Sequence, residues 1–284
     1  MHGVQTEWQP LLANLHNFFT HFRMAWPAEM KDFCVMQGTP NSRRGFASWG
    51  LLLGLWMCAA CQTPNTPPDM GALNSPLATL ASALMADTTS IDQARQTELN
   101  ELAKWTAKSL AERGSADLVF ICTHNSRRSH LSQVWAQVGA ALHGLDGVHT
   151  FSGGTEATAC NSRTVAAMQR AGFGVSVADI KHGEDNPTYR LEAGDGVDPM
   201  LCWSKTYADA ANPADGFLAV MTCSSADQSC PLVHGASARF AVPYVDPKVS
   251  DGTAEEGATY DERLRQIGTE MLYMMGQVAG EVSP

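Results

Sequence analysis

A cysteine and an arginine lie six positions apart in the stretch "FICTHNSRRSHLSQ", residues 120–133. Cys122 ends an apolar run, Arg128 closes a short polar loop, and a helix-like segment follows. At the end of a parallel strand, the N–H groups of such a loop and of the next helix converge on one point, which binds anions and favours a thiolate. A guanidinium can hold two oxygens of a tetrahedral oxyanion. The pattern therefore indicates thiolate attack on phosphorus, or on an arsenic analogue, with the charge held by preorganised donors.

Two further loop residues have predicted roles. Ser129 can donate a hydrogen bond to the thiolate or assist the leaving step, and Asn125 can fix the loop through bonds to the backbone. The alternative is a half-buried structural cysteine, which the position between "DLVFI" and a helix makes less favourable. We expect the oxyanion to be bound by the loop residues Thr123, His124, Asn125, Ser126, Arg127 and Arg128.

Strand-like and helix-like segments alternate around this loop. The expected strands are 117–122, 148–154, 216–223 and 239–247, and the expected helices are 129–142, 161–173 and 260–279. This order predicts an α/β fold, a three-layer αβα domain with a four-stranded, mostly parallel sheet. The catalytic domain should span 116–284, with a polar insertion at about 181–213 over the edge that carries the active site.

A helical extension is predicted before this domain, at 76–115. Its apolar residues fall mostly on one face, as in a helix that braces a neighbouring domain. Thr89 or Ser90 is the expected N-terminal cap, and Gly114 the expected end.

Composition narrows the function classes. The formal net charge of −10 argues against nucleic-acid binding, which needs a basic surface. Eight cysteines in 284 residues are too few for a disulfide scaffold. No C-x-x-C pairs with a second one, so no metal site is expected. The "CAAC" at 58–61 ends an apolar run and is not interpreted as a redox motif.

The N-terminal region has the pattern of an export signal. An arginine pair at 43–44 precedes an uncharged run at 46–60, which is shorter than the roughly 20 residues of a membrane span. Residues 36–61 are interpreted as a twin-arginine-like signal with a lipobox-like end, so that Cys61 would carry a lipid, and 62–75 as a Pro-rich tether. A plain signal anchor or a buried apolar segment is the alternative.

These features predict export machinery as a partner, a lipid anchor in the membrane, and a location in the cell envelope, at the periplasm. The protein would be cytoplasmic if the segment is not a working signal. Residues 1–35 have no domain pattern, and translation from Met36, or from Met30, is the favoured explanation of them.

The motif "VFICTHNSRRS" resembles the nucleophile loop of the low-molecular-weight protein tyrosine phosphatase superfamily, which includes thioredoxin-coupled arsenate reductases. The resemblance covers residues 117–280 and includes "SGGTEATACNSRTVAAMQRAGF" and "VPYVDPKVSDGTAEEGATYDERLRQIGTEM". It implies a fold like that of phosphotyrosine protein phosphatase I. It also implies that Asp246 is the general acid, which protonates the leaving oxygen and then activates water.

A second motif, "VMTCSSADQSCPLV", resembles the arsenate reductases of this superfamily. The resemblance implies that arsenate forms an adduct on Cys122, that Cys223 attacks the sulfur of Cys122 and releases arsenite, and that Cys230 resolves the disulfide. An external thioredoxin-like thiol would then reduce the protein, with no bound cofactor. Two buried cysteines that act as small hydrophobic residues are the alternative.

Two departures from the family pattern leave the substrate open. His124 stands where the family usually has Gly, and Arg127, where it often has Cys, adds a second positive charge at the anion site. Our first hypothesis is arsenate reduction, and the second is hydrolysis of phosphomonoesters, phosphotyrosine above all, by Cys122, Arg128 and Asp246. The third is a non-catalytic oxyanion-binding lipoprotein. Export would favour the phosphatase, or a relay served by thiols of the envelope, because a thioredoxin relay belongs in a reducing compartment.

Overall fold

The computed structural model of the protein describes residues 67–182, 185–230 and 232–283. The predictions for 1–35, for the export signal at 36–61 with Cys61, and for the start of the tether lie outside these residues. The second half of the expected tether is already packed, because residues 70–72 form a short 3-10 helix, η1, and Leu73 is buried. No helix in the described ranges is both long and apolar enough to cross a membrane.

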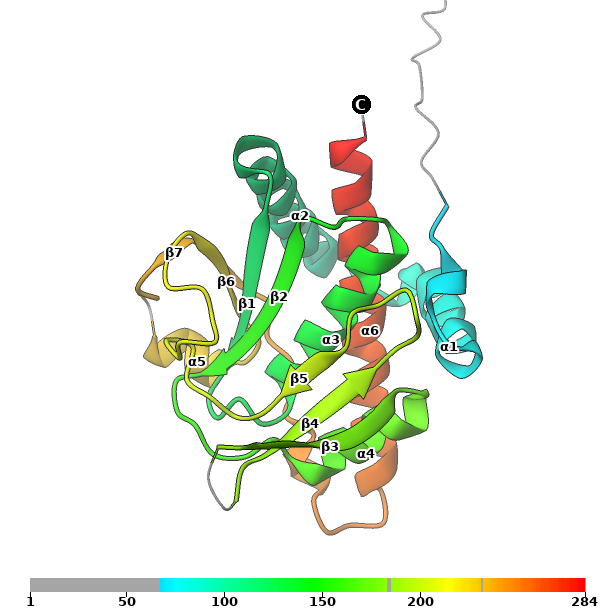
Figure 1. Ribbon diagram of the computed structural model, residues 1–284, viewed down its shortest axis with the longest axis vertical. Coiled ribbons are helices and arrows are strands. Elements are labelled where there is room, and N and C mark those ends of the chain that lie inside the picture. Colours follow the sequence, from blue (N-terminus) through cyan, green and yellow to red (C-terminus); the bar gives the residue numbers. More distant parts are fainter. Residues whose placement is uncertain (1–66, 183–184, 231, 284) are drawn as a thin grey trace, which may run out of the picture. The chain divides into compact units, whose positions relative to one another are not determined.

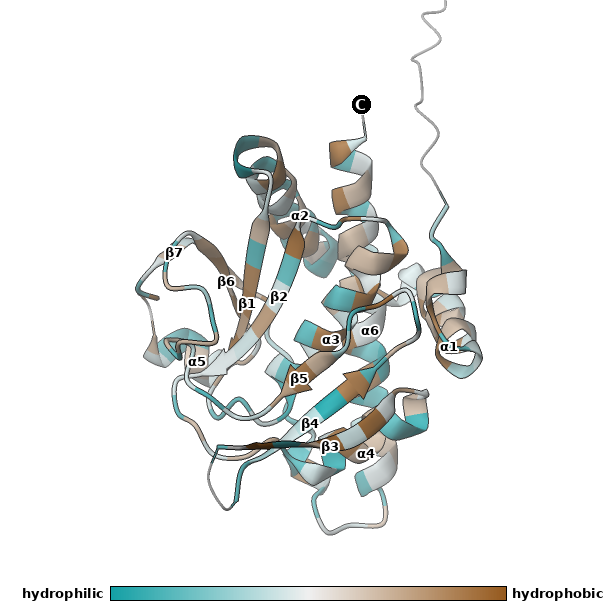
Figure 2. Cartoon of the chain, in the orientation of Figure 1, coloured by the Kyte–Doolittle hydropathy of each residue, from teal (hydrophilic) through white to brown (hydrophobic). Residues whose placement is uncertain are grey.

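A parallel sheet of four strands forms the centre of the protein (Figure 1). The strands are β1 (Ala116–Cys122), β2 (Val148–Gly154), β6 (Phe217–Met221) and β7 (Ala236–Ala241), in the order β2-β1-β6-β7. All three pairings are parallel, which confirms the predicted α/β class. Figure 2 shows hydrophobic residues along the central strands β1 and β6, as expected for strands covered on both faces.

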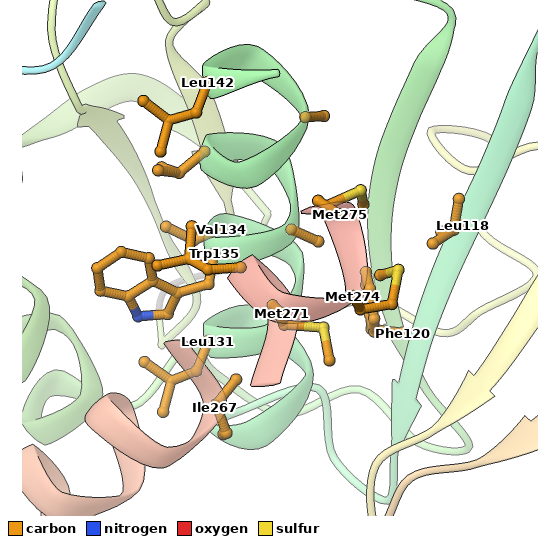
Figure 3. Close-up of a cluster of buried hydrophobic side chains, with 14 of the residues drawn as sticks. Leu118, Phe120, Leu131, Val134, Trp135, Leu142, Ile267, Met271, Met274 and Met275 are labelled. Carbon is orange, nitrogen blue, oxygen red and sulfur yellow. The ribbon is translucent and has the colours of Figure 1, made fainter. Parts of the chain in front are cut away.

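The two faces of β1 contribute to two separate hydrophobic clusters. Leu118 and Phe120 belong to the larger cluster, whereas Val119 and Ile121 belong to the smaller one, because successive side chains of a strand point to opposite faces. The larger cluster also contains α3 (Arg128–Leu142) and α6 (Glu256–Val282), as Figure 3 shows. The smaller cluster includes Ala226 of the short helix α5 (Ser224–Ser229). The domain also contains α4 (Ser162–Ala171) and the 3-10 helix η3 (Pro247–Ser250).

The predicted extension is helical and belongs to the larger cluster. It consists of α1 (Ser75–Ala86), the 3-10 helix η2 (Thr88–Ser90) and α2 (Gln93–Arg113). Leu99 and Leu102 of α2 are fully buried in the same cluster as α6. Gly114 ends α2 at φ 74°, a left-handed conformation that glycine adopts without strain. The N-terminal cap, however, is Asp92, which accepts a bond from Arg95 N (2.8 Å), and not Thr89 or Ser90, because those two belong to η2.

The predicted insertion is not an irregular polar stretch. It contains β4 (Pro187–Glu192) and β5 (Met200–Cys202), which form an antiparallel sheet with β3 (Gly174–Lys181), in the order β3-β4-β5. In β4 the buried Thr188 and Leu191 are separated by the half-buried Tyr189 and the exposed Arg190. Hydrophobicity alone did not predict this strand, because its outward residues are polar and one of its buried residues is a threonine.

Candidate active site

The candidate nucleophile lies where β1 ends. Cys122 is 3% exposed, and its Sγ is 3.1 Å from Oγ of Ser129, in the first turn of α3. Ser129 Oγ also accepts a bond from Asn125 Nδ2 (2.9 Å). Because that contact uses the hydroxyl as an acceptor, the hydroxyl hydrogen is free to be donated to the sulfur. The arrangement suits a thiolate that receives a hydrogen bond before it attacks.

Asn125 gives the loop its shape. Its φ of 45° makes it the one non-glycine residue with positive φ in the described ranges, a conformation that asparagine tolerates better than most residues. The side chain is buried, and Oδ1 accepts a bond from the backbone N of Lys205 (3.0 Å). A strained backbone held by two side-chain bonds is typical of a preorganised functional loop.

The backbone of the loop retains free donors. Within the described part of the chain, the N–H groups of residues 124–128 donate no hydrogen bond to a protein acceptor. Asn125 and Ser126 are buried, and buried N–H groups without partners are rare in proteins. Together with the N-terminus of α3, these donors form a site for an anion beside the Cys122 sulfur.

Arg128 joins this loop to the predicted general acid. Its Nη2 donates to Oδ2 of Asp246 (2.7 Å), and its Nη1 donates to the carbonyl of Tyr244 (3.0 Å). Nε of Arg128 is buried and bonds to no acceptor in the described residues. Asp246 also caps η3 by accepting from Lys248 N (3.1 Å). The fold thus brings Arg128 of the nucleophile loop into direct contact with Asp246.

Arg127, which we expected to add a second positive charge at the anion site, is paired with side chains from later in the chain. Its Nε donates to the hydroxyl of Tyr260 (2.7 Å), and its Nη2 contacts Asp251 Oδ2 at 3.3 Å. Tyr260 in turn donates to Asp251 Oδ1 (2.8 Å), and burial is the main reason why the pKa of Tyr260 rises to about 12. The charge of Arg127 is therefore balanced by a carboxylate from the loop after η3. No local motif pointed to Tyr260 or Asp251, because their contact with the loop is made only by the fold.

The remaining loop residues contact neighbouring segments. Thr123 O accepts a bond from Glu156 N (2.8 Å), and Ser126 Oγ donates to Ala159 O (2.6 Å). His124 is half exposed, with Nε2 at 3.7 Å from Oε2 of Glu156. These contacts tie the loop to the segment between β2 and α4.

Two features that the sequence analysis missed support the loop from outside. The carbonyl of His124 accepts a bond from Ser204 Oγ (2.8 Å), next to Lys205, so the end of the insertion holds the loop. Gly154, at the end of β2, lies so close that a Cβ there would be 2.7 Å from Thr123 O and 2.8 Å from Asn125 N. A glycine is required at this position because the loop occupies the space of a side chain.

Of the two downstream cysteines, Cys223 lies beside the loop. Because Ile121 of β1 pairs with Met221 of β6, Cys122 and Cys223 follow neighbouring strands at the same edge of the sheet. Cys223 Sγ is 3.5 Å from Thr123 Oγ1 and accepts from Ala226 N (3.3 Å), and the residue is 1% exposed.

Cys230 lies at the other end of α5. It is partly exposed, and its Sγ contacts Leu232 O at 3.4 Å. The six residues of α5 correspond to about 9 Å of helix, so the two thiols are at opposite ends of one short helix. The cysteines of the described residues, Cys122, Cys160, Cys202, Cys223 and Cys230, are all free thiols.

We compared the sequence with family models and with curated proteins. No family model matches the sequence. An arsenate reductase of Bacillus licheniformis is 29% identical over 152 residues, which is 53% of this chain and 88% of that protein.

Solved structures also match, at low sequence identity. The low-molecular-weight protein tyrosine phosphatase of T. tengcongensis matches 56% of this chain and 97% of its own, with 15% identity and a TM-score of 0.38. The thioredoxin-dependent arsenate reductase of Corynebacterium glutamicum matches 69% of this chain and 74% of its own, with 15% identity and a TM-score of 0.30.

The sequence similarity to arsenate reductases agrees with the resemblance that the motifs indicated. The chain is thus similar to arsenate reductases.

Proposed function

We propose that this protein is a cysteine-nucleophile enzyme that reduces arsenate through a relay of Cys122, Cys223 and Cys230. The observation that carries the proposal is the placement of Cys223, which lies at the strand end next to Cys122 and within 3.5 Å of Thr123 in the nucleophile loop. A phosphatase has no use for a thiol there, whereas a reductase needs a second thiol close to the first.

The first step is attack of the Cys122 thiolate on arsenic. The free N–H groups of the loop and Arg128 hold the arsenate oxygens, and one oxygen leaves as water after it takes a proton from Asp246. The guanidinium must then exchange part of its contact with Asp246 for the oxyanion.

The second step transfers two electrons to arsenic. The Cys223 thiolate attacks the sulfur of Cys122, the electron pair of the sulfur–arsenic bond stays on arsenic, and arsenite leaves. Two thiolates have then become the Cys122–Cys223 disulfide, while As(V) has become As(III).

The third step requires movement. Cys230 attacks the sulfur of Cys223 and releases the Cys122 thiolate, but Cys230 starts at the far end of α5. This helix must therefore unwind before the second disulfide can form. An external thiol reductant, which we propose to be thioredoxin-like, then reduces the Cys223–Cys230 disulfide at the partly exposed Cys230.

One observation favours a second reaction, the hydrolysis of phosphomonoesters. The 2.7 Å contact between Arg128 and Asp246 brings a carboxyl group to the oxyanion site, where it can protonate an aryl oxygen as it leaves and then activate water. In that reaction Cys122 is the nucleophile in the first step and the leaving group in the second, and Cys223 is not involved. The third hypothesis, a non-catalytic lipoprotein, is not favoured, since the similar proteins are enzymes.

The deciding experiment compares the two reactions in the full-length protein. Arsenate-dependent oxidation of thioredoxin, with NADPH and thioredoxin reductase, should be seen for the wild type and lost in Cys223→Ser. Cys202→Ser, a buried cysteine of β5, is the matched control and should retain turnover. Hydrolysis of an aryl phosphate that survives Cys223→Ser, with no arsenate-dependent thiol oxidation in the wild type, would instead establish the phosphatase.

We also propose that the protein is exported and anchored through a lipid on Cys61, on the basis of the basic, apolar and small-residue segments at 36–61. The reductant would then be a thiol system of the cell envelope. Fractionation of cells that express the wild type or Cys61→Ala tests the anchor. A variant that still partitions with membranes would rule out lipidation.

A further inference from the structure

Two arginines hold consecutive carbonyl groups in the segment that leads to Asp246. Arg128 Nη1 donates to Tyr244 O (3.0 Å), and Arg95 Nη2 donates to Pro243 O (2.7 Å). Arg128 belongs to the nucleophile loop, whereas Arg95 comes from the first turn of α2, in the helical extension. The extension therefore reaches the segment between β7 and η3 that leads to Asp246.

Arg95 is itself tightly held. Its Nη1 donates to Glu98 Oε2 (2.8 Å), its Nε lies 3.4 Å from Glu270 Oε2, and its guanidinium carbon is 5.5 Å from the centre of the Tyr244 ring. The side chain of Arg95 is 16% exposed, and that of Glu270 is 5% exposed. Burial raises the pKa of Glu270 while the charge of Arg95 opposes that rise, so the arginine supports an ionised carboxylate inside the protein.

The contacts of Pro243 and Tyr244 fix the path of the chain toward Asp246. Tyr244 N donates to Thr222 O (3.1 Å) and Val242 N to Met221 O (2.9 Å), which anchors one side of the segment to the end of β6. The carbonyls of Pro243 and Tyr244 have their donors in the two arginines. Without Arg95 the segment would retain its bonds to β6 but lose the contact on the carbonyl that lies three residues before Asp246.

We infer that Arg95 is a positioning residue that sets the place of the Asp246 carboxyl relative to Arg128. The inference rests on the proposed catalytic role of Asp246 and adds a function to the extension, which does more than complete the core. Lysine at this position keeps the charge but cannot reach Pro243, Glu98 and Glu270 at the same time, because it has one nitrogen where arginine has three.

The test is a double-mutant cycle between Arg95→Lys and Asp246→Asn, measured in whichever of the two reactions the wild type catalyses. Arg95→Lys should lower kcat by roughly tenfold, since small displacements of a catalytic group are costly, and leave KM near the wild-type value. In the Asp246→Asn background the same change should have no further effect, because Arg95 acts through that carboxyl. The matched control is Arg113→Lys, on the same helix, whose Nη1 donates to Gly216 O and not to the Asp246 segment.

A second measurement does not depend on turnover. Hydrogen exchange of the amides in 244–251 should become faster in Arg95→Lys and stay unchanged in Arg113→Lys. Multiplicative effects in the cycle, wild-type kcat in Arg95→Lys or Asp246→Asn, or unchanged exchange in 244–251 would each overturn the inference. A wild-type protein without either activity would contradict the proposed function instead, while the exchange measurement would still decide whether Arg95 holds the segment.

Discussion

The nucleophile loop and the segment with the two downstream cysteines lie at the same edge of the sheet, yet they are held very differently. In the loop, Asn125 makes two buried side-chain bonds, and the sulfur of Cys122 already has its partner in Ser129. In the other segment, Cys223 is buried beside the loop, but Cys230 is partly exposed at the far end of a six-residue helix.

The end of this second segment is held by an arginine of the neighbouring strand. Arg239 of β7 donates to Asp227 O (2.7 Å) and to Cys230 O (3.3 Å), and these bonds keep the end of α5 in place. The comparison indicates that the nucleophile loop is preorganised, whereas the resolving step of the proposed relay would need a rearrangement, which short helices allow at low cost. Each prediction below tests one side of this difference.

The largest effect is expected for Cys122→Ser. It should lower the turnover of either substrate by at least about a thousandfold, because a serine hydroxyl in this loop is a far weaker nucleophile than a thiolate. Steady-state kinetics measures the effect, and circular dichroism should show an unchanged fold. Residual turnover above about one tenth of wild type would contradict the assignment of the nucleophile.

Loss of Cys223 and loss of Cys230 should have different consequences in arsenate reduction. Cys230→Ser should release one equivalent of arsenite and stop as the Cys122–Cys223 disulfide, whereas Cys223→Ser should release none. Arsenite quantification and mass spectrometry of the trapped protein distinguish the two variants. If both variants behave alike, the order of the relay is wrong.

Asn125→Ala should weaken both the loop and the fold. It removes the hydrogen bonds to Ser129 and Lys205. It also places an alanine at φ 45°, a backbone conformation that alanine adopts less readily than asparagine. We expect a loss of about 2–3 kcal/mol in the free energy of unfolding and roughly a hundredfold in kcat.

Asn125→Gly is the comparison for that variant, because glycine tolerates the backbone angle but lacks the bonds. It should recover about 1 kcal/mol of the stability and little of the kcat. Urea unfolding and kinetics of the two variants separate strain from hydrogen bonding. Full recovery of kcat by glycine would contradict a role for the side-chain bonds.

Lowering the pH should have a smaller effect, on stability, through the buried His130 in the first turn of α3. Burial first, and the charge of Lys205 second, lower the pKa of His130 to about 3, so the native protein keeps this side chain neutral. In the unfolded chain this histidine becomes protonated near pH 6.5, whereas in the folded chain it stays neutral. Its contribution to the free energy of unfolding is therefore complete above pH 6.5 and is lost as the pH falls toward 3.

Between pH 7 and pH 5, protonation of His130 in the unfolded chain should lower the free energy of unfolding by about 2 kcal/mol. Urea unfolding at both pH values measures it, with His130→Asn as the reference for all other titrating groups. The difference in stability between pH 7 and pH 5 should be smaller in His130→Asn. Equal differences in the two proteins would contradict the buried neutral histidine.

The class of fold followed from the sequence because strand and helix periods are local. The parallel strands and the helices after Cys122 and before the C-terminus needed only apolar runs and amphipathic spacing. The strands of the insertion were not predicted, because Thr188 is buried without being hydrophobic. The N-terminal cap of α2 was predicted too early in the chain, because Thr89 and Ser90 belong to the 3-10 helix at 88–90.

The chemical groups of the site could be read from the sequence alone: a thiol, a guanidinium and a hydroxyl on one loop between a strand and a helix. This was possible because residues 122–129 are contiguous, so that their geometry depends on local structure. Three contacts could be known only from the folded protein: Arg127 with Asp251, Arg95 with the segment before Asp246, and Cys223 with the nucleophile loop. These contacts join residues far apart in the chain, and they exist only once the core has packed the helices and strands together.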